Sequence, residues 1–146
     1  MLSTTTRVVL AEDNKTVRKG IKRFLNRATD IEVVGEAEDG IEALQLVDKL
    51  LPDLLLLDVE MPRLNGIEVA QRLKKSKTKT RILALSAYDD QEYIQEMLAN
   101  GASGYLVKDE APERILEAVR GVVRGEVGWV SPQVKARLDR KKANKS

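Results

Sequence analysis

The sequence between residues 53 and 62 is Asp53-Leu54-Leu55-Leu56-Leu57-Asp58-Val59-Glu60-Met61-Pro62. Its four consecutive leucines show no alternation with polar residues, a pattern that predicts a short strand covered on both faces. Strands of this kind are typical of the centre of a parallel sheet that has helices on both sides. Asp58 follows the leucines directly, so we expect its carboxylate at the carboxyl end of an inner strand.

Strand and helix patterns alternate along the rest of the chain. Short apolar runs predict strands at residues 7–11, 31–37, 53–57, 81–86 and 103–107. Apolar residues at helical spacing predict a helix after each strand, with apolar faces at residues 17–28 and 41–51 and helices at about 66–75, 89–100 and 111–124. These units predict an α/β three-layer sandwich around a parallel sheet. Alternation does not fix the strand order, and we expect the flavodoxin-like (βα)5 order 2-1-3-4-5.

The composition restricts the chemistry that the chain can perform. The 146 residues include no cysteine and no histidine. Disulfides, catalytic triads that need histidine, Cys- or His-ligated zinc and a phosphohistidine on this chain are therefore excluded. Carboxylates, hydroxyls and lysines remain, and an oxygen-rich site suits Mg²⁺. The polar residues 1–6 and the short apolar runs predict no signal peptide, no contact with a membrane and a cytoplasmic location.

Charge is distributed unevenly along the chain. The net charge is +2, but residues 131–146 carry six lysines and arginines and one aspartate. We therefore expect one globular domain at residues 1–128 and a basic linker or C-terminal tail at residues 129–146, with a short helix at 134–144. The tail has three readings: a linker to a further domain, the end of a single-domain protein, or a nucleic-acid contact. Basic residues without interleaved aromatics are weak evidence for DNA recognition, and we favour the linker.

Polar residues follow every predicted strand, although Glu38 and Asp39, after the second strand, would lie at the sheet's edge, away from the others. Glu12 and Asp13 end the first strand, Asp58 the third, Ser86 the fourth and Lys108 the fifth. Ligands of open α/β sheets bind at the carboxyl ends of the strands, and strands one and three are neighbours in the expected order. Three carboxylates would then converge, which is tolerable around a divalent cation. The sequence therefore predicts a Mg²⁺ site at this edge.

Lys108 and Ser86 would complete a site for phosphoryl chemistry. A carboxylate such as that of Asp58 is a competent nucleophile towards phosphorus and gives an aspartyl phosphate. An ammonium, a hydroxyl and a cation would hold the phosphoryl oxygens. Each residue alone has a commoner structural role, such as a helix cap for Asp13 or a solvated charge for Lys108. Their occurrence at one sheet edge favours the functional interpretation.

Taken together, these residues resemble the signature of the response-regulator receiver domain over about residues 7–124. The matching positions are Glu12-Asp13, Asp58, Met61-Pro62, Gly66, Ser86-Ala87, Tyr105 and Lys108. Residues 101–109 and 125–133 are similar to the NarL/FixJ subfamily, in which a linker joins the receiver to a DNA-binding helix-turn-helix domain. No helix-turn-helix pattern is present in this chain, so the resemblance implies contact with DNA only through an absent output domain.

The resemblance also implies a role for each acid. Asp58 accepts the phosphoryl group from a sensor histidine kinase, and Asp13 and Asp58 bind Mg²⁺ directly. Glu12 acts through a water molecule, and its longer side chain stands where the family often has aspartate. The backbone carbonyl of Glu60 completes the shell of the metal.

A switch is implied as well. Lys108 pairs with the phosphoryl group, Ser86 shifts to hydrogen-bond it, and Tyr105 swings inward into the vacated space. Asp109 stands where many members of the family have proline, so a cis peptide is less expected there. A homodimer formed on phosphorylation is a further expected partner.

We therefore predict a two-component response regulator that controls an output, with transcription as the favoured one. It would be a signalling switch and not an enzyme, catalysing only its own phosphoryl transfer and aspartyl-phosphate hydrolysis. A stand-alone receiver acting by protein contact is one alternative. Another is a Mg²⁺-dependent phosphohydrolase, although Glu60 stands where that class commonly has a second aspartate. The third is an interaction module independent of phosphorylation, which a missing acid or lysine would suggest.

Overall fold

The computed structural model describes residues 5–109 and 112–144, with side chains up to residue 139. Its strands are β1 (Thr6–Ala11), β2 (Ile31–Ala37), β3 (Leu54–Asp58), β4 (Arg81–Ser86), β5 (Gly104–Val107) and β6 (Trp129–Val130). Its helices are α1 (Lys15–Asn26), α2 (Gly40–Leu50), α3 (Gly66–Lys75), α4 (Gln91–Ala99), α5 (Pro112–Val123) and α6 (Pro132–Asn144). Among these described residues, no helix is long and apolar enough to span a membrane.

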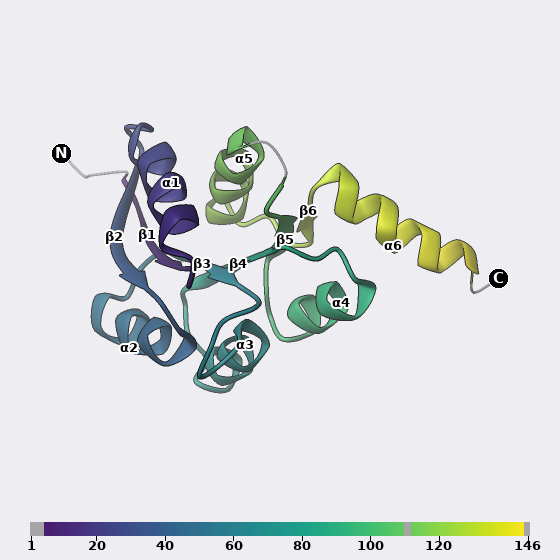
Figure 1. The fold of residues 1–146 in the computed structure, drawn as a ribbon, viewed down its shortest axis with the longest axis horizontal. Coiled ribbons are helices and arrows are strands. Elements are labelled where there is room, and N and C mark those ends of the chain that lie inside the picture. The colour runs from purple at the N-terminus through teal and green to yellow at the C-terminus, as the bar shows by residue number, and fades with distance from the viewer. Residues whose placement is uncertain (1–4, 110–111, 145–146) are drawn as a thin grey trace.

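The strands form one parallel sheet in the order β2-β1-β3-β4-β5-β6. Helices α1 and α5 cover one face, and α2, α3 and α4 cover the other (Figure 1). The expected order 2-1-3-4-5 and the three-layer architecture are confirmed, and β6 extends the sheet by one strand.

Strand β3 lies at the centre, and all of its residues are buried. Leu55 and Leu57 belong to the core beneath α2, α3 and α4, whereas Leu54 and Leu56 belong to the core beneath α1 and α5. Successive side chains of a strand point to opposite faces, so a strand buried on both faces needs apolar residues at every position. The leucine run therefore forms the two-faced inner strand that its sequence predicts.

The loop between β3 and α3 is held close to the end of β3. Asn65 caps α3 in a reciprocal arrangement with Glu68, and the backbone N–H of Gly66 donates to the carbonyl of Val59 at 2.8 Å. A Cβ atom at Gly66 would lie 2.6 Å from the carbonyl oxygen of Asp58. Glycine thus allows the start of α3 to pack against the backbone that presents Asp58.

The C-terminal segment begins on the sheet. Trp129 and Val130 pair with β5 as a parallel strand, which the sequence analysis did not predict. Val134, in α6, is fully buried in the core next to α4. The start of the segment expected as a linker is thus packed against the body, while the proposed boundary between residues 128 and 129 stays a prediction.

Small differences from the expected bounds concern the ends of elements. The helix expected at 89–100 begins at Gln91, after an extended Asp90. The expected start of the fifth helix at residue 111 lies outside the described residues, as do the side chains of the basic residues beyond 139.

Candidate functional site

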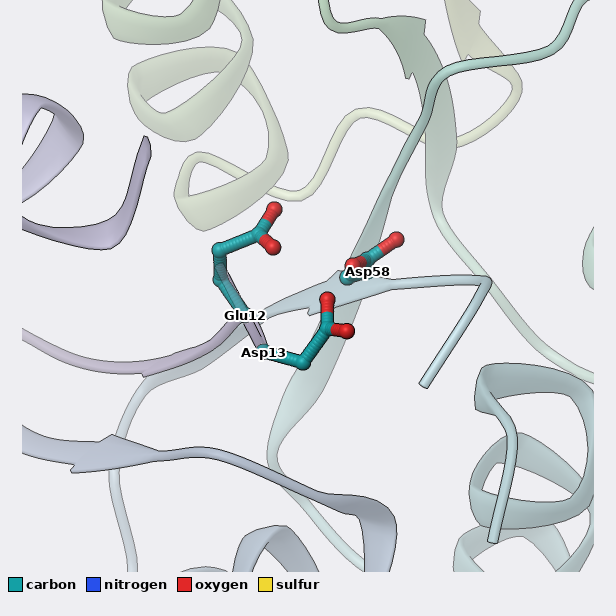
Figure 2. Close-up of side chains that lie close together, drawn as sticks. All are labelled: Glu12, Asp13 and Asp58. Carbon is teal, nitrogen blue, oxygen red and sulfur yellow. The ribbon is translucent and has the colours of Figure 1, made fainter. Parts of the chain in front are cut away.

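Three acids converge at the carboxyl edge of the sheet. Glu12 and Asp13 follow β1, and Asp58 ends the neighbouring β3, as Figure 2 shows. One carboxylate oxygen from each acid lies within 4.8 Å of the others. Glu12 and Asp58 are 0% and 1% exposed, whereas Asp13 is exposed. The structure thus brings together the three acids that the sequence analysis selected.

Lys108 faces two of these acids from the end of β5. Its ammonium lies 2.6 Å from Glu12 Oε1 and 3.0 Å from Asp58 Oδ2. The backbone N–H of Lys108 donates to the carbonyl of Ser86 at 2.7 Å, which fixes the residue beside the end of β4. Burial lowers the pKa of Lys108, but the attraction of the Glu12 and Asp58 carboxylates outweighs burial and raises the pKa overall. Lys108 is therefore held as a cation against the acids.

Asp58 is an unusually basic carboxyl group. Burial, and then the charge of Glu12, raise its pKa to about 8, although hydrogen bonds from Lys108 and from the backbone N–H of Glu60 act in the opposite direction. The N–H of Glu60 donates to Asp58 Oδ1 at 3.0 Å. Each oxygen of Asp58 therefore has a donor, but one ammonium does not compensate two buried carboxylates.

The donor set fits a hard divalent cation. All three side chains offer carboxylate oxygens, which Mg²⁺ and similar ions prefer. Glu12 Oε1 is buried and, although it is close to the ammonium of Lys108, it receives no hydrogen bond of good geometry. The cluster thus carries more negative charge than Lys108 neutralises, and it is one that can bind a metal ion.

Glu12 is fixed by groups that the sequence analysis did not select. Its side chain accepts from the backbone N–H of Asn14, the residue that caps α1, at 2.8 Å. Its backbone carbonyl accepts from the guanidinium of Arg18 at 2.8 Å, and Arg18 is 7% exposed. Arg18 lies on the first turn of α1, a position for which no motif gave a signal.

Ser86 reaches the site through the side chain of Glu60. Ser86 is buried, and its hydroxyl donates to Glu60 Oε2 at 2.7 Å. The backbone N–H of Ala87 donates to Glu60 Oε1 at 3.2 Å. The sequence predicts the backbone carbonyl of Glu60 as a metal ligand, and it predicts that Glu60 and Tyr88 flank the site and tune hydrolysis. It does not predict the hydrogen bonds of the Glu60 side chain. Its position two residues after Asp58 was the available signal.

Tyr105 is fully buried between the sheet and the α4 side of the molecule. Its hydroxyl donates to the carbonyl of Tyr88 at 2.9 Å, and the N–H of Tyr88 donates to the hydroxyl of Ser86 at 3.0 Å. Burial raises the pKa of Tyr105. The ring therefore already points inward, in contact with the loop that carries Ser86, while its expected movement stays a prediction.

Comparison with known proteins decides the family. Residues 8–120 match the family model described as the response regulator receiver domain. This chain belongs to that family. The resemblance drawn from the signature residues is thereby confirmed.

Relatives of the chain include transcriptional regulators. The uncharacterized transcriptional regulatory protein YxjL of Bacillus subtilis is 42% identical over 120 residues, 82% of this chain and 55% of YxjL. The oxygen regulatory protein NreC of Staphylococcus carnosus is 39% identical over 133 residues, 90% of this chain and 61% of NreC. The chain thus spans somewhat more than half the length of these curated relatives.

Solved structures agree with the subfamily. The receiver domain of the putative regulator NarL of Mycobacterium tuberculosis has a TM-score of 0.81 at 38% identity, covering 84% of this chain and 98% of that domain. A LuxR-family regulator of Aurantimonas has a TM-score of 0.90 at 27% identity, covering 95% of this chain and 99% of the other. The described fold is therefore that of NarL-type receivers.

Proposed function

We propose that the chain is a phosphorylation switch in which Asp58 accepts a phosphoryl group. The observation that carries the proposal is the environment of the Asp58 carboxylate. Its two oxygens face the ammonium of Lys108 and the N–H of Glu60, and it stands beside the acids Glu12 and Asp13. A nucleophile, a cation and an acidic metal-binding cluster in one place are what phosphoryl transfer to a carboxylate needs.

Mg²⁺ is the metal that we assign to the cluster. Asp13 and Asp58 would hold it directly, Glu12 through water, and Glu60 through its backbone carbonyl. When bound, it would neutralise charge on the phosphoryl oxygens and on the acids.

In the proposed transfer, an oxygen of Asp58 attacks the phosphorus of a phosphohistidine on a sensor histidine kinase. The P–N bond breaks as the P–O bond forms, and the departing imidazole takes up a proton. Lys108 lies within 3.0 Å of Asp58 and is placed to neutralise the phosphoryl oxygens. Hydrolysis of the aspartyl phosphate by water would reset the switch. We propose that the chain catalyses only this phosphoryl transfer and this hydrolysis.

We further propose that Ser86 and Tyr105 transmit the change to an output. The hydrogen bonds from Tyr105 to Tyr88 and from Tyr88 to Ser86 link the two residues and support this role. The names and lengths of the curated relatives support transcription as the output, through a DNA-binding domain. A homodimer formed on phosphorylation and a cytoplasmic location are further parts of the proposal.

Acetyl phosphate with Mg²⁺ tests the proposal. The wild-type protein should gain the mass of one phosphoryl group in intact-protein mass spectrometry, and EDTA should prevent the gain. Asp58→Asn should not be modified. A wild type that stays unmodified with Mg²⁺ would refute the proposal.

A further inference from the structure

The side chain of Glu60 occupies two donors at the carboxyl end of β4, and one of them, the hydroxyl of Ser86, is expected to bind the phosphoryl group in the proposed function. Its Oε2 accepts from the hydroxyl of Ser86 at 2.7 Å, and its Oε1 accepts from the backbone N–H of Ala87 at 3.2 Å. Ser86 ends β4 and Ala87 follows it, and β4 pairs with β3, which ends at Asp58. These are the hydroxyl and one of the amide donors that face the acceptor edge of the sheet.

A carboxylate and a phosphoryl group share the chemistry that these donors recognise. Each presents two or more anionic oxygens on one atom, and each accepts short, charge-assisted hydrogen bonds. Glu60 receives one donor on each of its two oxygens, as two oxygens of a phosphoryl group would. Glu60 is tethered two residues after Asp58, so its effective concentration at the donors is high.

We infer that the Glu60 carboxylate is a built-in placeholder that competes with the phosphoryl group for Ser86 and Ala87. The inference rests on the proposed function and extends it. While Glu60 holds the Ser86 hydroxyl, Asp58 can be modified only if this carboxylate leaves the two donors. Glu60 thereby sets the affinity of the site for a phosphoryl group, and it couples occupation of the site to the loop that carries Tyr88.

The contact to Tyr88 extends the consequence to the switch. The hydroxyl of Ser86 donates to Glu60 while it accepts from the N–H of Tyr88. Transfer of the Ser86 hydroxyl from Glu60 to a phosphoryl oxygen would reorient the group on which that N–H depends. Glu60 is thus a positioning residue, because it acts through Ser86 and Ala87.

Beryllofluoride, which mimics a phosphoryl group on aspartate, tests the inference by titration with saturating Mg²⁺, followed by NMR of the Ala87 amide. Glu60→Ala should lower the half-saturating concentration about tenfold, the effect of one charge-assisted hydrogen bond. Glu60→Asp keeps the charge but is one methylene too short to reach both donors, and should show a similar gain. Because Glu60 also offers its backbone carbonyl to the proposed metal, a Mg²⁺ titration without beryllofluoride sets the saturating Mg²⁺ concentration separately for each of the three proteins.

Two controls distinguish competition for the Ser86 and Ala87 donors from a general effect of removing a negative charge. Glu32→Ala removes an exposed acid on β2 and should leave the titration unchanged. The gain from Glu60→Ala should shrink in a Ser86→Ala background, because one of the two contested donors is already absent.

The outcomes distinguish this inference from the proposed function. One contrary result is that Glu60→Asp binds beryllofluoride with the affinity of the wild type, while Glu60→Ala binds it more tightly. Only the negative charge of residue 60 would then matter, and the inference would be refuted. An unchanged gain in the Ser86→Ala background refutes it equally, and the proposed function stands in both cases. If neither the wild type nor any variant binds beryllofluoride, both fail.

Discussion

Glu12 and Asp58 are two fully buried acids that share the ammonium of Lys108. Like charges at short range repel, and burial strengthens the repulsion. Burial and, after it, the charge of Glu12 raise the pKa of Asp58. Without metal, the site is therefore a source of instability that Lys108 partly relieves.

Removal of Lys108 should expose that instability. In magnesium-free buffer, Lys108→Ala should lower the free energy of unfolding by about 3 kcal/mol, because it leaves a buried carboxylate without its cation. Urea denaturation in EDTA measures the change. Lys19→Ala, which removes an exposed lysine of α1, serves as the control and should leave the midpoint unchanged. Equal midpoints for both variants would contradict the compensating role of Lys108.

The pKa of Asp58 predicts a pH dependence in the absence of metal. The value of about 8 lies above that of the unfolded chain, so the folded state holds the proton more tightly. The stability contributed by protonated Asp58 is therefore full at low pH and is lost as the pH rises towards 8. Between pH 6 and 8 in EDTA, the wild type should lose about 1 kcal/mol per pH unit relative to Asp58→Asn. Parallel pH profiles of the two proteins would contradict the raised pKa.

At the level of residues, the sequence predicted the acids, Lys108 and a place for Glu60 beside the site, but not the partners of the Glu60 side chain. The acids and the lysine end separate strands, so topology alone brings them to one edge. The direction of a half-buried glutamate in a loop depends on donors from another strand, here Ser86 and Ala87. No periodicity in the sequence encodes that direction.

Among the elements, the β3–α3 loop controls the position of Asp58. A Cβ atom on Gly66 would lie 2.6 Å from the Asp58 carbonyl oxygen and 2.7 Å from the Cα of Val59, both backbone atoms that cannot move independently. The start of α3 and the end of β3 are thus interlocked.

Gly66→Ala should displace this loop. We expect a loss of about 2 kcal/mol in stability, as for other overpacked sites, and weaker binding of beryllofluoride. Gly20→Ala is the matched control: its Cβ atom would meet nothing within 4 Å, so the gain in helix propensity should stabilise α1. Thermal unfolding measures the stability of both variants. Equal unfolding temperatures for Gly66→Ala and Gly20→Ala would contradict the close packing of the start of α3 against the end of β3.

Helix α6 is the second element with a defined attachment. Arg137 pairs with Asp89 at 3.2 Å, and its carbonyl accepts from the side chain of Gln91 at 2.7 Å. Val134 is fully buried beneath it. These contacts join α6 to the start of α4, next to the loop that carries Ser86 and Tyr88.

Truncation of Val134 should loosen α6. Val134→Ala should cost about 2 kcal/mol through the cavity that it leaves, and it should speed hydrogen exchange in α6. Val127 is 76% exposed, so Val127→Ala should change neither quantity. The single tryptophan, Trp129 in β6, offers a fluorescence signal for the same change. Protection of α6 that is unaffected by Val134→Ala would contradict its packing on the core.

Strand β6 is an element that the sequence does not predict. Two residues are too few for a recognisable period, and Trp129-Val130 becomes a strand because β5 offers an open edge. Gly104 makes room, since a Cβ atom there would collide with the carbonyl oxygen of Trp129. The longer elements carry their periodicity within themselves and were predicted with nearly correct bounds.

For the whole molecule, the sheet order determines which strand ends meet. Strands β1 and β3 are neighbours at the centre, and β4 and β5 follow, so Asp58 has acids on one side and Ser86 and Lys108 on the other. Strand β2 lies at the sheet's edge, and Glu36 within it and Glu38 just after it pair with Arg18 instead. The architecture thus separates acids of the site from acids that anchor α1.

Location of the transferred group tests the account most directly. After reaction with acetyl phosphate and Mg²⁺, hydride reduction of the acyl phosphate and peptide mass spectrometry identify the modified residue. We predict modification at Asp58 alone. Modification at Glu12 or Asp13, or labelling that persists in Asp58→Asn, would contradict it.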